Sequence, residues 1–275
     1  MHTRCQSVVM EDPDYHAMQE ADTIGIFEPG SNIEREVDWD RLFHVLVLTG
    51  AAFAFTIALG LVIMIPLFIL GGISVNLTTL QIEIAPWAFL AITISELGFL
   101  VPPIRYIRKH GFDFDAIGLK RGTPVKEILF GLGTGAVMLA SNILITFIVY
   151  ELVGYPEGDQ VGLIYAQTIP ELVAWVVVMF VVVGLSEELL FRGFLQRRMD
   201  IYFRDRRSRY KLISLVITSL IFAAIHLDLY GMPARFVLGL FLGWLAQKRN
   251  YSIIGPTVAH GLNNSVVVIL AFLGI

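Results

Sequence analysis

Three ionisable residues interrupt an apolar stretch of the sequence at a spacing that suits chemistry. The segment GLSEELLFRGFLQRR follows the run LVAWVVVMFVVV, so Glu187, Glu188 and Arg192 fall inside a candidate membrane helix. Charged side chains are costly in a bilayer, and those that occur there are usually functional or paired. Residues four apart share a helix face, so we expect Glu188 and Arg192 to neutralise each other. Glu187 points about 100° away from Glu188 and lacks that partner.

Two further apolar segments carry polar groups that could cooperate with Glu187. In FAAIH, Phe222 and His226 are four residues apart, and in HGLNN the same spacing separates His260 from Asn264. Each pair therefore shares one helix face. At 1.5 Å per residue, the polar groups of the three helices reach overlapping depths in the membrane. We predict a water-containing cavity lined by Glu187, His226, His260 and Asn264, in which the unpaired carboxylate acts as a general base.

The composition of the chain is that of a polytopic membrane protein. Of the 275 residues, 56% are hydrophobic and 16% are charged, and the mean hydropathy is +0.70. Soluble domains carry about 25% charged residues. The net charge of −4 and its segregation along the chain suggest no nucleic-acid partner, and the single cysteine, Cys5, cannot form an intramolecular disulfide.

Apolar windows of about 20 residues are needed to cross a bilayer, and seven are present. We expect them at about 42–70, 85–104, 126–150, 170–195, 212–230, 234–247 and 253–274. The sequence therefore predicts an all-α transmembrane bundle of about seven helices. Pro102 and Pro103 are expected to end or kink the second helix, because proline lacks the backbone N–H that a helix interior needs.

Lys and Arg alternate between rich and poor loops, as the positive-inside rule requires. The 71–84 and 151–169 loops have none, the 105–126 segment has six, and seven lie between the fourth and fifth helices. This pattern predicts a cytoplasmic N-terminus, with Arg197 and Arg198 helping to hold the end of the fourth helix on that side. The chain then divides into an acidic, flexible tail at 1–41, with ten Asp and Glu, and a transmembrane domain at 42–275.

Other polar and small residues of the predicted helices suit helix packing. Glu96, Ser141 and Asn142 are expected to make interhelical hydrogen bonds, although they could also reach the cavity. Glycines four residues apart allow close approach of neighbouring backbones. Such pairs are Gly131 with Gly135 and Gly239 with Gly243.

Together the segments EELLFR, FAAIH and HGLNN resemble the motifs of the CPBP (Abi) family of intramembrane proteases, which includes the CAAX prenyl proteases of the Rce type. The motifs occur in the family's order on successive helices. The resemblance covers about residues 170–268, and the preceding part of the chain matches only in being membrane-spanning.

The resemblance implies a role for each matching residue. Glu187 and His226 would activate a water molecule, with Glu187 as the general base. His260 and Asn264 would stabilise the oxyanion that forms when this water attacks the peptide bond. The residues implied to support the site are Glu188, Arg192 and Phe222.

Two alternatives stay open at this point. Glu187, His226 and His260 could instead be zinc ligands, although the sequence has no HExxH motif and no cofactor is otherwise expected. The chain could also be a non-enzymatic membrane protein, such as an immunity factor, a scaffold or a proton-coupled carrier. Carriers often contain repeated halves, and no such repeat is visible here.

The resemblance implies hydrolysis of a peptide bond in a lipid-anchored or membrane-inserted substrate, with CAAX-type C-terminal processing as the expected form. The expected partners are the lipid bilayer and a prenylated or otherwise anchored peptide, although no motif of the sequence itself indicates a prenyl group. We expect a prokaryotic cytoplasmic membrane and an active site that is accessible from the cytoplasmic side.

Overall fold

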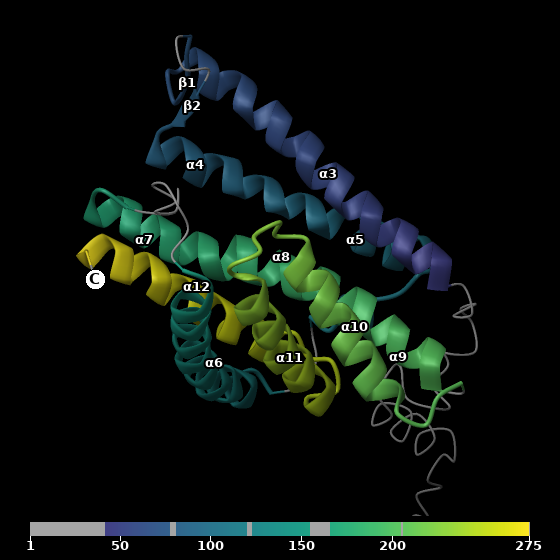
Figure 1. Cartoon of the computed structure of the whole chain (residues 1–275). Helices are drawn as coiled ribbons and strands as arrows, with labels where there is room; N and C mark the ends of the chain where they lie inside the picture. Colours follow the sequence, from purple (N-terminus) through teal and green to yellow (C-terminus); the bar gives the residue numbers. More distant parts are fainter. Residues whose placement is uncertain (1–41, 78–80, 120–122, 155–165, 205, 275) are drawn as a thin grey trace, which may run out of the picture. The chain divides into compact units, whose positions relative to one another are not determined.

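The structure, a computed structural model, describes residues 42–77, 81–119, 123–154, 166–204 and 206–274 (Figure 1). The predicted acidic tail lies outside these residues. Within them the chain is a bundle of helices, and five of these are long and apolar enough to cross a membrane. The predicted fold class, an all-α polytopic bundle, is confirmed. The number of spans and the side of the N-terminus stay predictions.

The five long helices agree closely with predicted spans. They are α3 (Leu42–Ile69), the continuous helix α4–η1–α5 (Pro86–Thr93, Ile94–Leu100 and Val101–Lys109), α6 (Pro124–Val153), the continuous helix α7–η3–α8–η4–α9 (Ile169–Val178, Met179–Gly184, Leu185–Glu188, Leu189–Gln196 and Arg197–Arg204) and α12 (Ile254–Leu273). The remaining helices are α10 (Tyr210–Ala224), α11 (Met232–Lys248) and the short 3₁₀ turn η2 (Phe114–Ile117). A hairpin that the sequence did not predict, β1 (Ile73–Asn76) with β2 (Gln81–Ile84), joins α3 to α4.

Proline and threonine mark where several helices begin. Proline lies in the first helical positions of α4, α6, α7 and α11, where its missing N–H leaves no bond unmade. At α7, the Thr168 side chain accepts a hydrogen bond from the Glu171 backbone N–H (3.4 Å), and the Glu171 carboxylate accepts one from the Gln167 N–H (2.7 Å). These bonds satisfy donors that a helix start would otherwise leave orphaned.

The expectation that Pro102 and Pro103 end or kink the second helix is correct only in part. The helix continues to Lys109, but the seven residues before the prolines, Ile94–Leu100, are wound as a 3₁₀ helix. Proline has no N–H to donate to the carbonyl four residues earlier. In the 3₁₀ segment each backbone N–H bonds to the carbonyl three residues earlier, so the carbonyls before the prolines are bonded differently from those of an α-helix. Glu96 lies in this 3₁₀ segment.

Helix α10 is shorter than predicted. It ends at Ala224 instead of about residue 230, and at 1.5 Å per residue its 15 residues span about 22 Å, less than the roughly 30 Å of a bilayer core. Non-helical backbone at membrane depth is tolerated where it lines a water-filled cavity. The α10–α11 connection contributes His226, Asp228, Tyr230 and Gly231 to the lining of a cavity.

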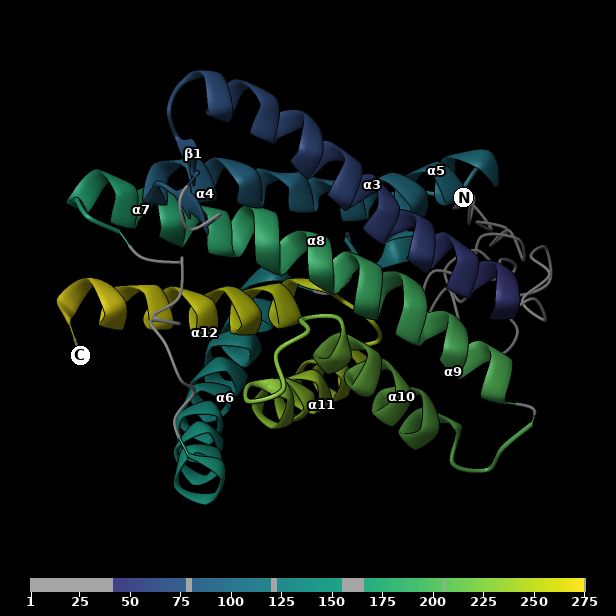
Figure 2. The same cartoon turned by 45° about the horizontal axis from the view of Figure 1, so that its top comes forward.

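Helix α12 packs against helices from both sides of the bundle. It contacts α6 on one side and η3 of the long helix on the other (Figure 2). A Cβ added at Gly135 would lie 3.1 Å from the Ala259 backbone, and one added at Gly261 would lie 2.4 Å from the Phe180 ring. The predicted close packing at the glycine pairs is confirmed for Gly135, and Gly261 is a further contact that the sequence did not indicate.

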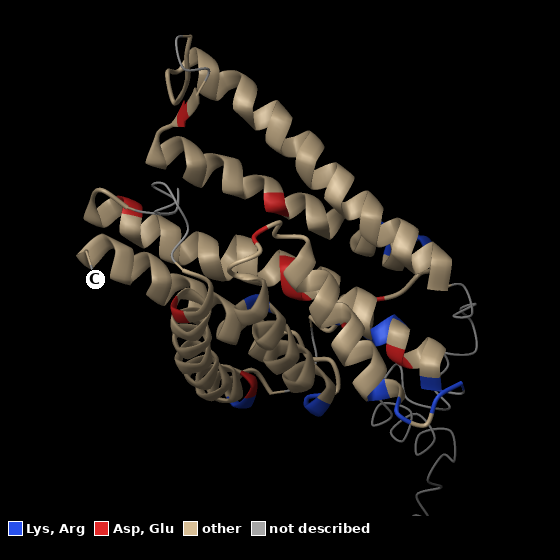
Figure 3. Cartoon of the chain, in the orientation of Figure 1, with Lys and Arg blue, Asp and Glu red and all other residues tan. Residues whose placement is uncertain are grey.

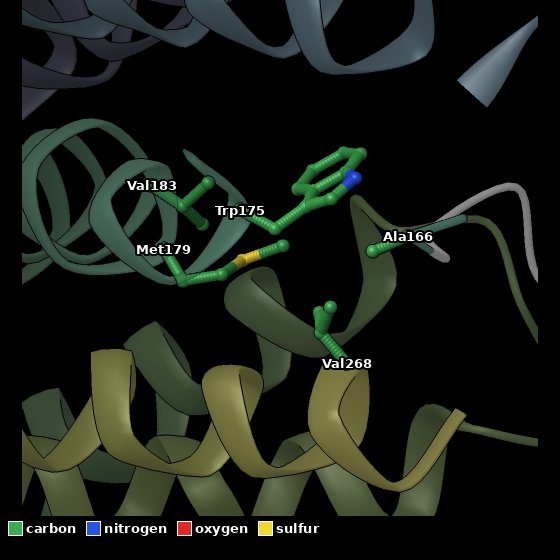
Figure 4. Close-up of a cluster of buried hydrophobic side chains, with 5 residues drawn as sticks. All are labelled: Ala166, Trp175, Met179, Val183 and Val268. Atoms are coloured by element: carbon green, nitrogen blue, oxygen red, sulfur yellow. The ribbon is translucent and has the colours of Figure 1, made fainter. Parts of the chain in front are cut away.

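An apolar cluster joins the long helix to α12. Trp175, Met179 and Val183 point from α7 and η3 toward Val268 of α12 and toward Ala166 (Figure 4). Each of the five side chains is buried. Their burial fixes the face of the long helix that looks toward α12.

Lys and Arg gather at one end of the bundle, around the end of α9 and the start of α10 (Figure 3). Arg197 and Arg198, which were expected to help hold this end of the helix on the cytoplasmic side, are both buried at 1% exposed, and the side itself stays a prediction. The Arg197 guanidinium donates to the Ala116 carbonyl (3.1 Å), and that of Arg198 lies 4.0 Å from the Phe194 ring centroid. These arginines hold the end of the helix to its protein neighbours, since a buried guanidinium needs such partners.

The close packing at Gly261 leads to a stability prediction. Gly261→Ala forces the Phe180 ring away, which we expect to lower the free energy of unfolding by about 1–3 kcal/mol. Thermal unfolding in detergent measures the change. Gly133→Ala is the matched control, because a Cβ there meets nothing within 4 Å. Equal stability of the two variants would contradict the proposed contact.

Candidate active site

The four polar residues expected to form a site line one cavity. Its volume is about 720 Å³, and its walls come from α4, η1, α6, the long helix, α10, α11, the connection between these two, and α12. A volume of this size accommodates a short peptide. Its polar lining includes Glu187, His226, His260 and Asn264.

Glu187 continues an apolar stripe of the long helix. Trp175, Met179 and Val183 recur every four residues, and Glu187 is the next position in this series. Met179, Val183 and Glu187 line the cavity. Glu187 lies in α8, a single α-helical turn between the π-helical stretches η3 and η4. Such π-helical turns are rare in proteins, and those that occur often lie at functional sites. Glu187 is 6% exposed, and its Oε2 has no hydrogen-bond partner in the described part of the chain.

Glu188 is bound on two sides. Its Oε1 accepts hydrogen bonds from Arg192 Nη1 and from His260 Nδ1, both at 2.9 Å, and the three side chains are buried. The expected pairing of Glu188 with Arg192 is thus present. Its contact with His260 was not expected, and it fixes the orientation of that ring because a carboxylate can only accept.

His226 lies beyond the end of α10, and not within it as the sequence suggested. Its Nδ1 donates to the Phe222 carbonyl at 2.7 Å, one of the acceptors that the end of a helix leaves unpaired. Because a carbonyl only accepts, the Nδ1 must carry the proton, and the Nε2 of the neutral ring is an acceptor. The His226 side chain is exposed on the cavity wall, where this nitrogen can accept a hydrogen bond from a water molecule.

Phe222 occupies the space between the charged residues. Its ring lies edge-on to His226 and His260, at centroid distances of 5.1 and 5.8 Å, and the Arg192 guanidinium is 4.5 Å from its centroid. An aromatic face attracts a cation, so this ring helps to hold Arg192 where Glu188 binds it.

A chain of hydrogen bonds orients Asn264. Thr146 Oγ1 donates to Asn142 Oδ1 (3.4 Å), Asn142 Nδ2 to Asn263 Oδ1 (3.4 Å) and Asn263 Nδ2 to Asn264 Oδ1 (3.2 Å). The last bond occupies the amide oxygen of Asn264 and leaves its Nδ2 to donate into the cavity. Asn142 makes the interhelical bond predicted for it. Asn263 was missed, although its place beside Asn264 could have drawn attention to it.

Glu96 and Ser141 differ from the expectation for them. Glu96 lines the cavity and its Oε2 has no hydrogen-bond partner in the described residues, and Ser141 donates within its own helix to Val137. Neither makes an interhelical hydrogen bond. The 3₁₀ winding that carries Glu96 packs against α8, so its carboxyl and that of Glu187 come from adjoining segments.

The arrangement does not form a metal centre as it stands. Among the described residues, no group of three or more His, Cys, Asp or Glu side chains is gathered closely enough to hold a metal ion. Glu187, His226 and His260 would have to come closer together to bind zinc, whereas the bonds made by the Nδ1 atoms of both histidines would still let Nε2 coordinate a metal. The zinc alternative stays a prediction for a chelator experiment.

The sequence of this region matches a protein-family model. Residues 169–266 match the model described as type II CAAX prenyl endopeptidase Rce1-like. This region of the chain is similar to that family. The family is a protease family, so the Rce1-like region supports a membrane-embedded hydrolase over the non-enzymatic alternatives. No curated protein and no solved structure matches the chain.

The cavity lies away from the basic end of the bundle. On the long helix, Met179 and Glu187 precede Arg197 by about 27 and 15 Å of helix, and on α12 the cavity residues follow the basic Arg249. The positive-inside rule places the basic end in the cytoplasm. Access from the cytoplasmic side stays untested, and the position of the cavity favours access from the opposite side.

The two neighbouring glutamates should respond differently to the same substitution. Glu188→Gln leaves the buried Arg192 guanidinium without its counter-charge, and we expect a loss of about 3–5 kcal/mol in the free energy of unfolding. Glu187→Gln should change it by less than about 1 kcal/mol, since Glu187 Oε2 has no bond to lose. Thermal unfolding in detergent compares them, and equal losses would contradict this division.

Cysteine labelling can determine the side on which the cavity opens. In a Cys5→Ser background, Leu229→Cys places a thiol on the α10–α11 connection, at a residue that is 82% exposed. Lys211→Cys places a thiol at the basic end of the bundle. We expect a membrane-impermeant maleimide to label Leu229→Cys in intact cells and Lys211→Cys only after permeabilisation. The reverse pattern would establish access from the cytoplasm.

Proposed function

We propose that the protein is an intramembrane endopeptidase that cleaves near the C-terminus of a membrane-anchored substrate by means of an activated water. The observation that carries this proposal is the convergence of Glu187, His226, His260 and Asn264 on one cavity within the Rce1-like region. The long helix, the α10–α11 connection and α12, which are far apart in the sequence, contribute these groups, and the groups include the base and the hydrogen-bonding side chains that peptide hydrolysis requires.

Water activation falls to Glu187 and His226. The Glu187 carboxylate has an oxygen with no protein partner, and His226 presents an acceptor nitrogen to the same cavity. A water between them loses a proton to Glu187 as its oxygen attacks the scissile carbonyl. The proton then passes to the leaving amine as the C–N bond breaks, so the carboxylate is restored.

Oxyanion stabilisation falls to His260 and Asn264. The Asn264 Nδ2 is left available by the hydrogen-bond chain that ends on its oxygen. His260, whose ring is fixed by the hydrogen bond from its Nδ1 to Glu188, lines the same cavity and is the second group proposed to stabilise the oxyanion. Donors fixed before the reaction are effective in a site of low dielectric because they need no reorganisation.

The substrate is proposed to be a CAAX-type protein, whose C-terminal tripeptide is released after a lipid-modified cysteine. The family match supports this class in general. The apolar part of the lining, which includes Leu139, Met179 and Val183, suits aliphatic side chains of such a tripeptide. A lipid anchor would stay in the surrounding bilayer, where the outer surfaces of α3 and α6 expose many large apolar residues.

Cleavage of a prenylated CAAX peptide by purified protein tests the proposal. We expect release of the tripeptide, detected by mass spectrometry, and a fall of roughly 10²–10⁴-fold for Glu187→Gln, the loss expected for a general base. Glu171→Gln on the same helix is the matched control, because Glu171 does not line the cavity and glutamine keeps an acceptor; its rate should stay within about twofold. An active Glu187→Gln would overturn the mechanism.

Two further arms of this experiment test the substrate and the metal alternative. A matched peptide without the prenyl group should be cleaved more slowly, and equal rates would remove the prenyl group from the proposal. We expect no effect of a chelator. Loss of activity with a chelator, restored by zinc and not by magnesium, would establish the zinc alternative instead.

A further inference from the structure

The charges that line the cavity are unevenly distributed. Among the described lining residues, Glu96 and Glu187 carry carboxyl groups that form no salt bridge, whereas Arg235 is the one Lys or Arg side chain. A peptide that enters this cavity therefore meets acidic groups at one part of the wall and a guanidinium at another. This arrangement favours one direction of binding for a substrate that ends in a carboxylate.

Arg235 is held in position by its neighbours. Its Nη1 donates to Asp228 Oδ2 at 2.6 Å, and the Gly231 N–H donates to Asp228 Oδ1 at 3.1 Å. A Cβ at Gly231 would lie 2.2 Å from Arg235 Nη1, so the close approach requires glycine. Burial alone would raise the pKa of the Asp228 carboxyl, but the hydrogen bonds from Arg235 and Gly231 hold it below its usual range. Asp228 is therefore charged at neutral pH and can anchor the guanidinium.

The contact with Asp228 leaves part of the guanidinium available. Arginine has five N–H donors in a planar fork, and Asp228 takes one from Nη1. The side chain of Arg235 is 31% exposed where it lines the cavity. A second carboxylate can bind the remaining edge of the fork in a bidentate manner, which is the strong geometry for such pairs.

Arg235 also lies at a suitable distance from the proposed reaction centre. The Arg192 guanidinium, which binds Glu188, donates to the carbonyl of Gly239, four residues after Arg235 on α11. Residues four apart on a helix share a face and are about 6 Å apart along the axis. Three extended residues span about 10 Å. A tripeptide can therefore reach from the neighbourhood of Glu187 and Glu188 to Arg235.

We propose that Arg235, positioned by Asp228, binds the α-carboxylate at the C-terminus of the substrate. The distance between Arg235 and Glu187 then determines how far from the C-terminus the peptide is cleaved, and so restricts cleavage to the last few residues. Ala234 and Leu238, on the same stretch of α11, supply apolar surface beside the bound peptide. This inference rests on the proposed endopeptidase function and specifies how that function selects its bond.

Two peptides that differ at one group test this site. One CAAX peptide ends in a carboxylic acid and the other, of the same sequence, in a primary amide. We expect the wild type to cleave the acid about 10- to 100-fold more efficiently in kcat/KM, the range for a hydrogen-bonded charge pair. Arg235→Gln should bring the ratio close to one, and Arg235→Lys should keep part of it.

The acid-to-amide ratio is measured within each variant, so partial unfolding does not change it. Arg249→Gln is the matched control: this arginine is 27% exposed and paired to Glu127 at 2.6 Å, but lies outside the cavity lining, so the ratio should stay at the wild-type value. Equal cleavage of acid and amide by the wild type, or an unchanged ratio in Arg235→Gln, overturns the carboxylate site alone. Cleavage of neither peptide overturns the proposed function and this inference with it.

Discussion

The double engagement of the Glu188 carboxylate is the interaction on which the site depends. One oxygen of this buried side chain accepts from Arg192 and from His260, so it joins the long helix to α12 and, through the Arg192 contact with Gly239, to α11. Each of these charges would be costly alone in a medium of low dielectric, and together they compensate one another. Helix packing then follows from charge pairing as much as from shape. The neighbouring Glu187 makes none of these hydrogen bonds, so its Oε2 is available to a group in the cavity.

A second constraint comes from the length of the helices. Because α10 stops at Ala224, the connection to α11 carries backbone and polar groups to the cavity instead of crossing the remaining membrane as helix. Those groups include His226 and Asp228, which a longer helix would have placed on different faces. On the long helix, the apolar cluster of Trp175, Met179 and Val183 packs against Val268 of α12 beside Glu187.

The sequence predicted the long helices well because twenty apolar residues in a row have few other uses, and it predicted the Glu188–Arg192 pair because spacing alone determines it. It also identified the residues that line the cavity, helped by their resemblance to a known motif set. It could not give the end of α10, since its residues stay apolar through the turn, nor the His260 contact to Glu188, which depends on how two distant helices meet. The burial of Arg197 and Arg198 was missed for a related reason: arginine at a helix end serves equally as a topological signal and as a buried clamp, and only its neighbours distinguish the two.

The polarity of the bundle connects these features to the direction of the reaction. Lys and Arg gather at one end, and the cavity lies in the halves of the helices farther from it. In the proposed function, a substrate anchored in the bilayer approaches such a cavity sideways, and Arg235, held by Asp228, attracts its terminal carboxylate. The scissile bond, and not the terminus, would then lie beside the activated water. Charge placement would thus serve both the stability of the bundle, through the pairs of Glu188, and the choice of the bond, through Arg235.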